Sequence, residues 1–318
     1  MANFFEDNKD ILFHLEHTDL DEVITLMEDN FNEAKKYDYA PRSVKEARRN
    51  YVEVLKVAGE IMGTTVNANA ESVDESGCSF HDGKVEYASG TKENLKQILS
   101  ADLGGMTIPR RYGGLNLPTT VSTMVIEMVS RADASLMNIV GLQDIGETIN
   151  EYATEEIKQK YLPMFTSGKV TGAMILTEPD AGSDLQAVQT KAVLDESTGK
   201  WKLYGVKRFI TNGCADISLV LARSEAGSKD GRGLSMFLIE KDDTVQIRRI
   251  EHKLGIHGSP TCEMQFNGTP ALLVGKRKLG LIRYVMSLMN GARLAVSAQG
   301  LGVAEAAYRE AQIGRAHV

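Results

Sequence analysis

The chain has 318 residues, which is too long for one compact core and predicts two or three domains. Its 42% apolar and 25% charged residues exclude a disordered or fibrous protein. A net charge of −7 disfavours nonspecific binding to nucleic acid, and no run of about 18 apolar residues is present, so we expect neither a nucleic-acid partner nor a membrane span.

The three cysteines, Cys78, Cys214 and Cys262, are odd in number and lie far apart along the chain, without any C-x-x-C pair. They exclude a disulfide framework and a cysteine zinc site, and they are typical of reduced thiols. The first residues, 1–8, are acidic and lack the basic and apolar regions of a secretory signal. We therefore expect a cytoplasmic protein.

Helical patterns fill the first third of the chain. Apolar side chains recur at helical spacing over residues 19–36, and a second helix follows Ser43, which fits an N-cap with Glu46 at the capping-box position. Residues 64–90 are polar and predict a surface excursion, and residues 104–115 predict a constrained loop because they hold two glycine pairs and a proline. Further helices are predicted over residues 92–101, 122–131, 139–152 and 154–165.

The hydrophobic period changes to two after residue 170 and returns to the helical period from about Leu279. The order of helices, strands and helices lacks βαβ alternation, so we expect an α+β multidomain fold with a β-barrel-like middle part rather than a Rossmann fold. The predicted strands cover residues 172–176, 189–194, 201–206, 217–223, 234–240, 245–250 and 262–266.

These changes of pattern divide the chain into an N-terminal helical domain (1–168), a middle β-domain (169–275) and the first part of a C-terminal helical bundle (276–312). The last residues, 313–318, break the helical pattern without a cap. We expect this tail to be non-native and the reading frame to end early, which would leave the last helices without packing partners.

One stretch, Met174 to Asp184, has the composition of a ligand-binding loop. A short apolar strand ends in Thr177, and the turn that follows holds Gly182 and Ser183 but no bulky side chain. Phe209-Ile-Thr211 ends another strand in the same way, so two hydroxyls and an aromatic wall could meet one planar heterocycle. The alternatives are an ordinary turn at 180–183, and a core position for Phe209 with a turn at Asn212-Gly213. The six histidines show no metal-ligand spacing.

The residues 177–184, 209–213 and 253–263, in this order, resemble the acyl-CoA dehydrogenase family, and the resemblance runs from Met106 to Ala311. The long N-terminus and residues 289–294 are similar to a larger bacterial subgroup that includes methylthiopropanoyl-CoA dehydrogenase-like enzymes. The family's helix, β-domain and four-helix order agrees with the order predicted above.

The resemblance implies an FAD site and an acyl-CoA site. The implied cofactor contacts are Met174, Leu176, Thr177, Gly182, Ser183, Phe209, Ile210 and Thr211, with Thr177 on the flavin ring and Thr211 on flavin N5. Ser183 would lie near the pyrophosphate or the CoA, and Arg293 near the acyl-CoA. Phe209 stands where many members have tryptophan, which keeps an aromatic face.

The implied reaction is α,β-dehydrogenation of an acyl-CoA to the trans-2-enoyl-CoA, with electrons passed to electron-transfer flavoprotein. The catalytic base stays unknown, because Ala292 occupies the position where some members carry it, and in the others it lies downstream of Ala311. The resemblance implies a homo-oligomer for the full-length protein. The alternative is a noncatalytic relative that binds flavin or acyl-CoA.

Overall fold

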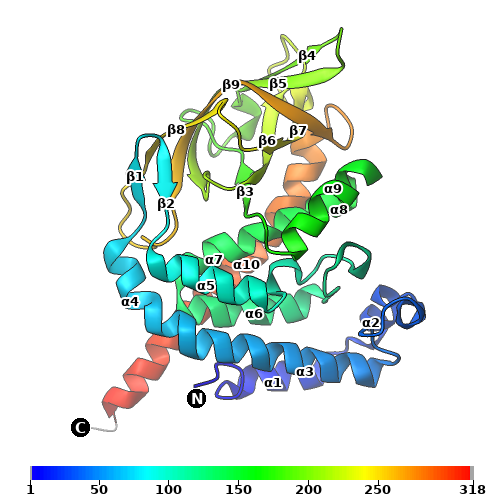
Figure 1. The fold of residues 1–318 in the computed structure, drawn as a ribbon, viewed down its shortest axis with the longest axis vertical. Coiled ribbons are helices and arrows are strands. Elements are labelled where there is room, and N and C mark those ends of the chain that lie inside the picture. Colours follow the sequence, from blue (N-terminus) through cyan, green and yellow to red (C-terminus); the bar gives the residue numbers. More distant parts are fainter. Residues whose placement is uncertain (1, 316–318) are drawn as a thin grey trace.

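Two layers of secondary structure make up the molecule (Figure 1). The computed structural model describes residues 2–315, with side chains to residue 312. Helices from the first half of the chain form one layer, strands from the second half form the other, and the last helix runs from the sheet across the helices. The helices of the first layer are α1 (Lys9–His17), α2 (Asp21–Met27), α3 (Val44–Ile61), α4 (Asn67–Ser76), α5 (Ser89–Ser100), α6 (Thr119–Ala132), α7 (Ala134–Val140), α8 (Ile145–Tyr152) and α9 (Glu155–Thr166).

The start of α3 confirms the predicted cap. The Glu46 amide donates to Ser43 Oγ at 3.2 Å, and the Glu46 carboxylate accepts from the Arg42 amide at 2.9 Å. The predictions for α5, α6 and α9 are also confirmed within a few residues, and residues 104–115 form a loop with two short 3₁₀ turns.

Two helix predictions were wrong in extent, and the predicted surface excursion is partly helical. The helix expected over 19–36 ends at Met27, because Glu28 turns inward to a buried pair with Arg110 (2.5 and 2.9 Å) and residues 29–31 take positive φ. The polar stretch 64–90 contains α4, which packs on α5 where Val73 meets Gly90. The helix expected over 139–152 is interrupted by a 3₁₀ turn, η5 (Gly141–Asp144).

The strands close into a barrel-like sheet. Their order is β3-β6-β4-β5-β9-β7, β7 pairs back with β6, and β8 joins β9. The predicted bounds of β6, β7 and β8 are confirmed. The strands are β3 (Gly172–Ile175), β4 (Lys191–Asp195), β5 (Lys200–Thr211), β6 (Ile217–Arg223), β7 (Leu234–Glu240), β8 (Val245–Ile250) and β9 (Thr261–Val274), and a small hairpin, β1 (Ser79–His81) with β2 (Lys84–Glu86), lies beside them.

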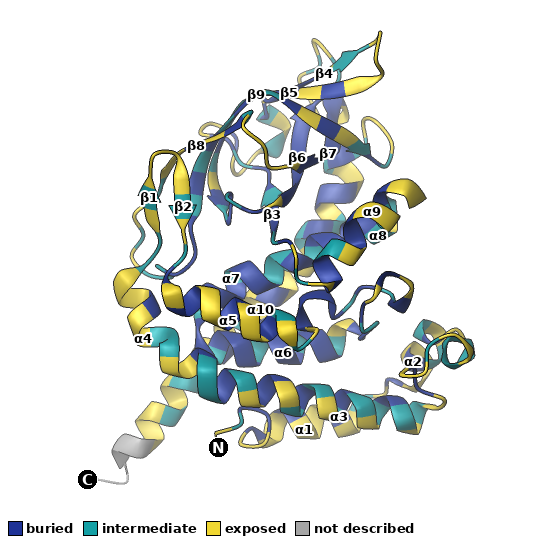
Figure 2. Cartoon of the chain, viewed as in Figure 1, coloured by how far each residue is buried: buried dark blue, intermediate teal, exposed yellow. Residues whose placement is uncertain are grey.

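Strand β6 is buried along its whole length because both of its faces are covered. Leu219 and Leu221 pack in a core shared with the helices, whereas Val220 and Ala222 pack inside the barrel against Phe237. Figure 2 shows this burial as continuous dark blue through the centre of the sheet. The core shared with the helices holds the sheet against the helical layer, and the other core fills the barrel.

The long helix α10 (Met286–Arg315) follows a π-helical turn at residues 280–285 and packs on α6. A Cβ on Gly302 would lie 2.4 Å from the Glu127 carbonyl oxygen, so the small residue permits the close approach. The expectation that the last helices lack partners is therefore wrong for this face, although Leu294, Val296 and Leu301 are exposed on α10.

The architecture confirms the predicted fold class: N-terminal helices, a β-barrel-like middle part, and helix at the C-terminal end. No helix in the described part of the chain combines the length and apolarity needed to cross a membrane. The predicted non-native tail, residues 313–318, falls outside the residues whose side chains are described. The domain boundaries at 168 and 275 stay predictions.

Candidate functional site

A cavity of about 300 Å³ lies where the ends of β3 and β5 meet α7 and α10. This volume is at the lower end of the range of about 300–1,000 Å³ found for small-molecule pockets, so it suits one ring system rather than a whole dinucleotide. None of its side chains is charged. The lining residues are Met137, Asn138, Gly141, Leu142, Met174, Leu176, Thr177, Gly182, Leu185, Phe209, Ile210, Thr211, Met289, Ala292, Ala295 and Val296.

The cavity brings together all of the predicted cofactor contacts except Ser183. Ser183 is exposed in the turn beside Gly182. Arg293 is also exposed and outside the lining, one residue after Ala292, and its guanidinium donates to Asn290 Oδ1 at 3.1 Å. The two strand ends, remote in sequence, thus share one site, as the repeated pattern predicted.

Phe209 faces the cavity, and its residue is 50% exposed. It has a φ of 61°, and the pairing of β5 with β9 shifts register between Lys207 and Ile210. This irregularity turns the ring out of the sheet, where the Arg208 guanidinium lies 4.7 Å from its centroid. The alternative that Phe209 belongs to the core is wrong.

The Arg208 backbone and a buried ion pair tie the two strand ends together. The Arg208 amide donates to the Thr177 carbonyl oxygen at 3.0 Å. Lys207 Nζ lies 3.0 Å from Glu178 Oε1 and donates to the Leu176 carbonyl oxygen at 2.7 Å, and both side chains are almost completely buried. Residues 176–178 are thereby held against residues 207–208.

Glu178 is ionised, and hydrogen bonds fix the position of its carboxylate. Its two carboxylate oxygens accept from the backbone amides of Gln189 (2.7 Å) and Thr190 (2.9 Å). Burial opposes ionisation, but Lys207 and these amides outweigh it and lower the pKa of Glu178. Burial lowers the pKa of Lys207 to about 8 against the pull of Glu178, so both groups are charged near neutral pH. Glu178 is therefore a structural residue that joins the two strand ends.

Asn212 is a site-forming residue that the sequence did not reveal. It is fully buried with a φ of 54°, directly after Thr211. Its amide group donates to the Gly172 carbonyl oxygen at 3.0 Å, and its carbonyl oxygen accepts from the hydroxyl of Tyr87. Tyr87 follows the β1–β2 hairpin, so the end of β5 is fixed both to β3 and to a segment of the helical layer. No local pattern marks a tyrosine more than a hundred positions away as a partner.

The cavity fits the ring of a flavin. The hydroxyls of Thr177 and Thr211 form no hydrogen bond with other groups in the described part of the chain, so both are free for a ligand at the cavity wall. The exposed Phe209 ring supplies an aromatic face, and the remaining walls are apolar. Among residues 2–312, no three His, Cys, Asp or Glu side chains lie close enough to hold a metal ion.

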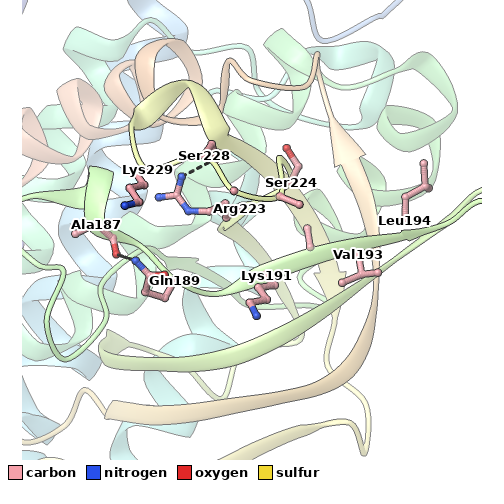
Figure 3. A pocket seen from close by; sticks show the side chains of 12 residues that line it. Ala187, Gln189, Lys191, Val193, Leu194, Arg223, Ser224, Ser228 and Lys229 are labelled. Carbon is pink, nitrogen blue, oxygen red and sulfur yellow. Dashed lines mark hydrogen bonds between the residues drawn. The ribbon is translucent and has the colours of Figure 1, made fainter.

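A larger hollow of about 710 Å³ lies between β4 and the loop after β6, away from the predicted contacts (Figure 3). Its buried cation, Arg223, is fully used by the protein. The guanidinium donates to the carbonyl oxygens of Val188 (3.0 Å), Gln186 (2.6 Å) and Asp230 (3.1 Å) and to Ser228 Oγ (3.0 Å). Arg223 thereby joins the two walls of the hollow by hydrogen bonds. We infer that it stabilises the fold and is not free to bind a ligand.

The fold and the cavity define a class of proteins in which a barrel-like sheet and the helices before and after it enclose one apolar site. The chain belongs to the acyl-CoA dehydrogenase family. Residues 52–169 match the model of the acyl-CoA dehydrogenase N-terminal domain, and residues 173–269 match that of the middle domain.

Individual relatives agree with this assignment. The 3-methylmercaptopropionyl-CoA dehydrogenase of Ruegeria pomeroyi is 30% identical over 95% of this chain and 52% of that protein. The butyryl-CoA dehydrogenase structure from Megasphaera elsdenii has a TM-score of 0.72 at 28% identity, covering 81% of this chain and 66% of that one. The acyl-CoA dehydrogenase complexed with FAD from Bacillus anthracis has a TM-score of 0.68 at 28% identity, covering 79% and 43%. This chain spans about half the length of the curated relatives it matches.

Proposed function

We propose that the chain forms the flavin site and one wall of the acyl site of an FAD-dependent acyl-CoA dehydrogenase, which converts a saturated acyl-CoA to the trans-2-enoyl-CoA. The observation that carries this proposal is the single uncharged cavity that gathers Thr177, Phe209 and Thr211 from two strand ends. The family membership and the FAD complex of the Bacillus anthracis relative support the choice of cofactor.

Each wall of the cavity has a separate role in this proposal. The hydroxyls of Thr177 and Thr211 orient the flavin ring, with Thr211 at N5, and Phe209 covers one face. When bound, FAD supplies the hydride acceptor of the reaction. Met289 and Ala292 of α10 line the side left for the acyl group, and the apolar walls exclude water, which strengthens every polar contact at the thioester.

The remaining assignments rest on the family resemblance alone. Ser183 would contact the pyrophosphate or the CoA, and Arg293 would contact the acyl-CoA. The electron acceptor would be electron-transfer flavoprotein, and the full-length protein would be a cytoplasmic homo-oligomer with domains at 1–168, 169–275 and from 276. The base that removes the α-proton should be a carboxylate in an apolar environment, and none of the described cavity-lining residues carries one.

Flavin binding tests the site. We expect the protein to retain FAD after gel filtration and to show a flavin absorbance spectrum, and T211V to weaken FAD binding by about tenfold through loss of one hydrogen bond. Thr198→Val, in the exposed turn between β4 and β5, is the matched control and should bind FAD like the wild type. A protein that stays colourless after incubation with FAD would overturn the proposal.

A second candidate function is acyl-CoA binding without dehydrogenation, which is favoured by the lack of a carboxylate among the described lining residues. Anaerobic addition of a saturated acyl-CoA to the FAD-loaded protein separates the two functions. Bleaching of the flavin absorbance indicates dehydrogenation, whereas a shifted but unbleached spectrum indicates binding alone.

A further inference from the structure

Asn138 of α7 is a polar residue at the cavity wall that the proposed reaction does not use. It lines the cavity and is only partly buried. Its Oδ1 accepts a hydrogen bond from Gln299 Nε2 of α10 at 3.0 Å, whereas its Nδ2 donates to no other group in the described part of the chain. Apart from Thr177 and Thr211, no other described lining residue has a side chain with a nitrogen or oxygen atom.

Gln299 fixes which end of the Asn138 amide meets α10. Gln299 Nε2 also donates to the Ala134 carbonyl oxygen at 2.8 Å, and because a carbonyl oxygen can only accept, the Gln299 atom at this point is the nitrogen. The Asn138 atom that meets the same nitrogen is then the oxygen, and the NH₂ group lies at the other end of the amide. Asn138 lines the cavity and Gln299 does not, so the free end of the amide is the donor end on the cavity side.

The amide lies on the side of the cavity that the proposed function leaves for the acyl group. Its partner Gln299 belongs to α10, and Ala292, Ala295 and Val296 of this helix line the cavity within two turns of Gln299. The two threonines assigned to the flavin ring come from the strand ends instead. An acyl chain along α10 therefore passes the Asn138 NH₂ group.

A donor without a partner in an apolar cavity discriminates between ligands by their hydrogen-bonding groups. An oxygen acceptor on the ligand satisfies the N–H group, a methylene removes its water without replacing the hydrogen bond, and a ligand ammonium places donor against donor. Because the Gln299 bond holds the amide, it cannot rotate to offer its oxygen to the ammonium without losing that bond.

We propose that Asn138 is a specificity-determining residue whose Nδ2 donates to an oxygen acceptor on the acyl chain, such as an ether or keto oxygen. It favours such acyl groups over purely aliphatic ones and disfavours acyl groups with an ammonium at the same place. This inference rests on the proposed function, because it requires the acyl group to occupy the α10 side of the cavity.

Anaerobic isothermal titration of the FAD-loaded protein with acyl-CoA pairs of equal chain length tests this inference. In two pairs an ether oxygen replaces one methylene: pentanoyl-CoA with 3-methoxypropanoyl-CoA, and hexanoyl-CoA with 4-methoxybutanoyl-CoA. In the third pair, heptanoyl-CoA with 6-aminohexanoyl-CoA, an ammonium replaces the terminal methyl. For the wild type we expect the ether in at least one pair to bind about fivefold to tenfold more tightly than its partner, and the ammonium ligand to bind more weakly than heptanoyl-CoA.

Two variants separate the donor role of Asn138 from its packing. N138D has nearly the same size and still accepts from Gln299, but it presents a carboxylate oxygen to the cavity, so the ether should bind more weakly than its partner and the ammonium ligand more tightly. Q299L releases the amide, which can then turn either end to the ligand. It should keep the preference for the ether and lose the discrimination against the ammonium, a pattern that a purely structural role of the bond does not predict.

N67D is the matched control, because it makes the same change at an exposed position of α4 and should leave every ratio as in the wild type. N138D should also retain FAD like the wild type. If N138D binds FAD more weakly while its acyl-CoA ratios are unchanged, the donor faces the flavin and the assignment to the acyl chain is wrong.

The two proposals fail in different ways. If the acyl-CoA ligands bind and the ratios within pairs agree within twofold between wild type and N138D, the assignment of Asn138 is wrong while the acyl-CoA site stands. If none of the six ligands binds to the wild type or to any variant, the proposed function is wrong and the specificity assignment falls with it.

Discussion

Replacing Lys207 with methionine should uncouple the two strand ends that wall the cavity. The side chain has about the same length but cannot pair with Glu178 or donate to the Leu176 carbonyl oxygen, so a buried carboxylate is left without its cation. Breaking a buried ion pair by removing one partner costs about 3–5 kcal/mol. Glu178 keeps two amide donors, from Gln189 and Thr190, so we expect K207M near the lower value, about 3 kcal/mol.

The reciprocal change, E178Q, should cost more than K207M. It leaves the Lys207 ammonium without an anionic partner in a fully buried position, so about 4–5 kcal/mol is expected. In E178Q/K207M neither charge is present, while the side-chain amide oxygen of the introduced glutamine can still accept from the backbone. The double variant should therefore be more stable than the sum of the single changes predicts, by about 2–3 kcal/mol.

Urea unfolding measures these free energies. Trp201, the one tryptophan of the chain, is buried in β5 and reports the unfolding of the sheet by its fluorescence. K160M is the matched control, because Lys160 pairs with Glu240 at 2.6 Å with side chains 58% and 51% exposed, and an exposed pair contributes at most about 1 kcal/mol. Equal losses for K207M and K160M, or strictly additive energies in the double variant, would refute the reasoning.

Three further predictions concern other contacts. Y87F removes the buried donor to Asn212 and should lower the free energy of unfolding by about 1–2 kcal/mol in urea, and an unchanged midpoint would show that the bond is not needed. G302V places a methyl group against Ser130, whose Cβ is 2.7 Å from the modified position, and should destabilise by about 1–3 kcal/mol, whereas G300V, with open space around it, should not. The pKa of Asp144 is raised on folding from 3.8 to about 8, so the unfolded chain loses this proton first and the stability contributed by the group falls as pH rises from about 4 to 8. The free energy of unfolding of D144N should lack this fall, and parallel pH profiles for wild type and D144N would contradict the raised pKa.

Local patterns in the chain were sufficient for most of the sheet. Strands β6 and β7 begin and end where the apolar runs do, because both strands are covered on both faces and are therefore mostly apolar along their length. The Ser43 cap was equally readable, since its donor and acceptor lie three residues apart. The helix expected over 19–36 failed because a distant arginine, Arg110, draws Glu28 out of the helical path.

The candidate site was likewise predictable only in part. Thr177, Phe209 and Thr211 could be predicted because each stands at the end of a strand in a recognisable motif, and motif and strand are contiguous in the chain. The contribution of Met289 from α10 could not, since a helical apolar pattern does not state which surface it will cover.

The sequence by itself determined the order of helices and strands, the family, and the two loops that face the cavity, because these depend on neighbouring residues. Only the tertiary structure decided that Lys207 is the buried partner of Glu178, that the Tyr87 hydroxyl donates to Asn212, and that burial raises the pKa of Asp144. The physical reason is that charge, hydrogen bonding and burial depend on which groups meet across the fold. The sequence does not show whether a given lysine, tyrosine or aspartate faces solvent or a site.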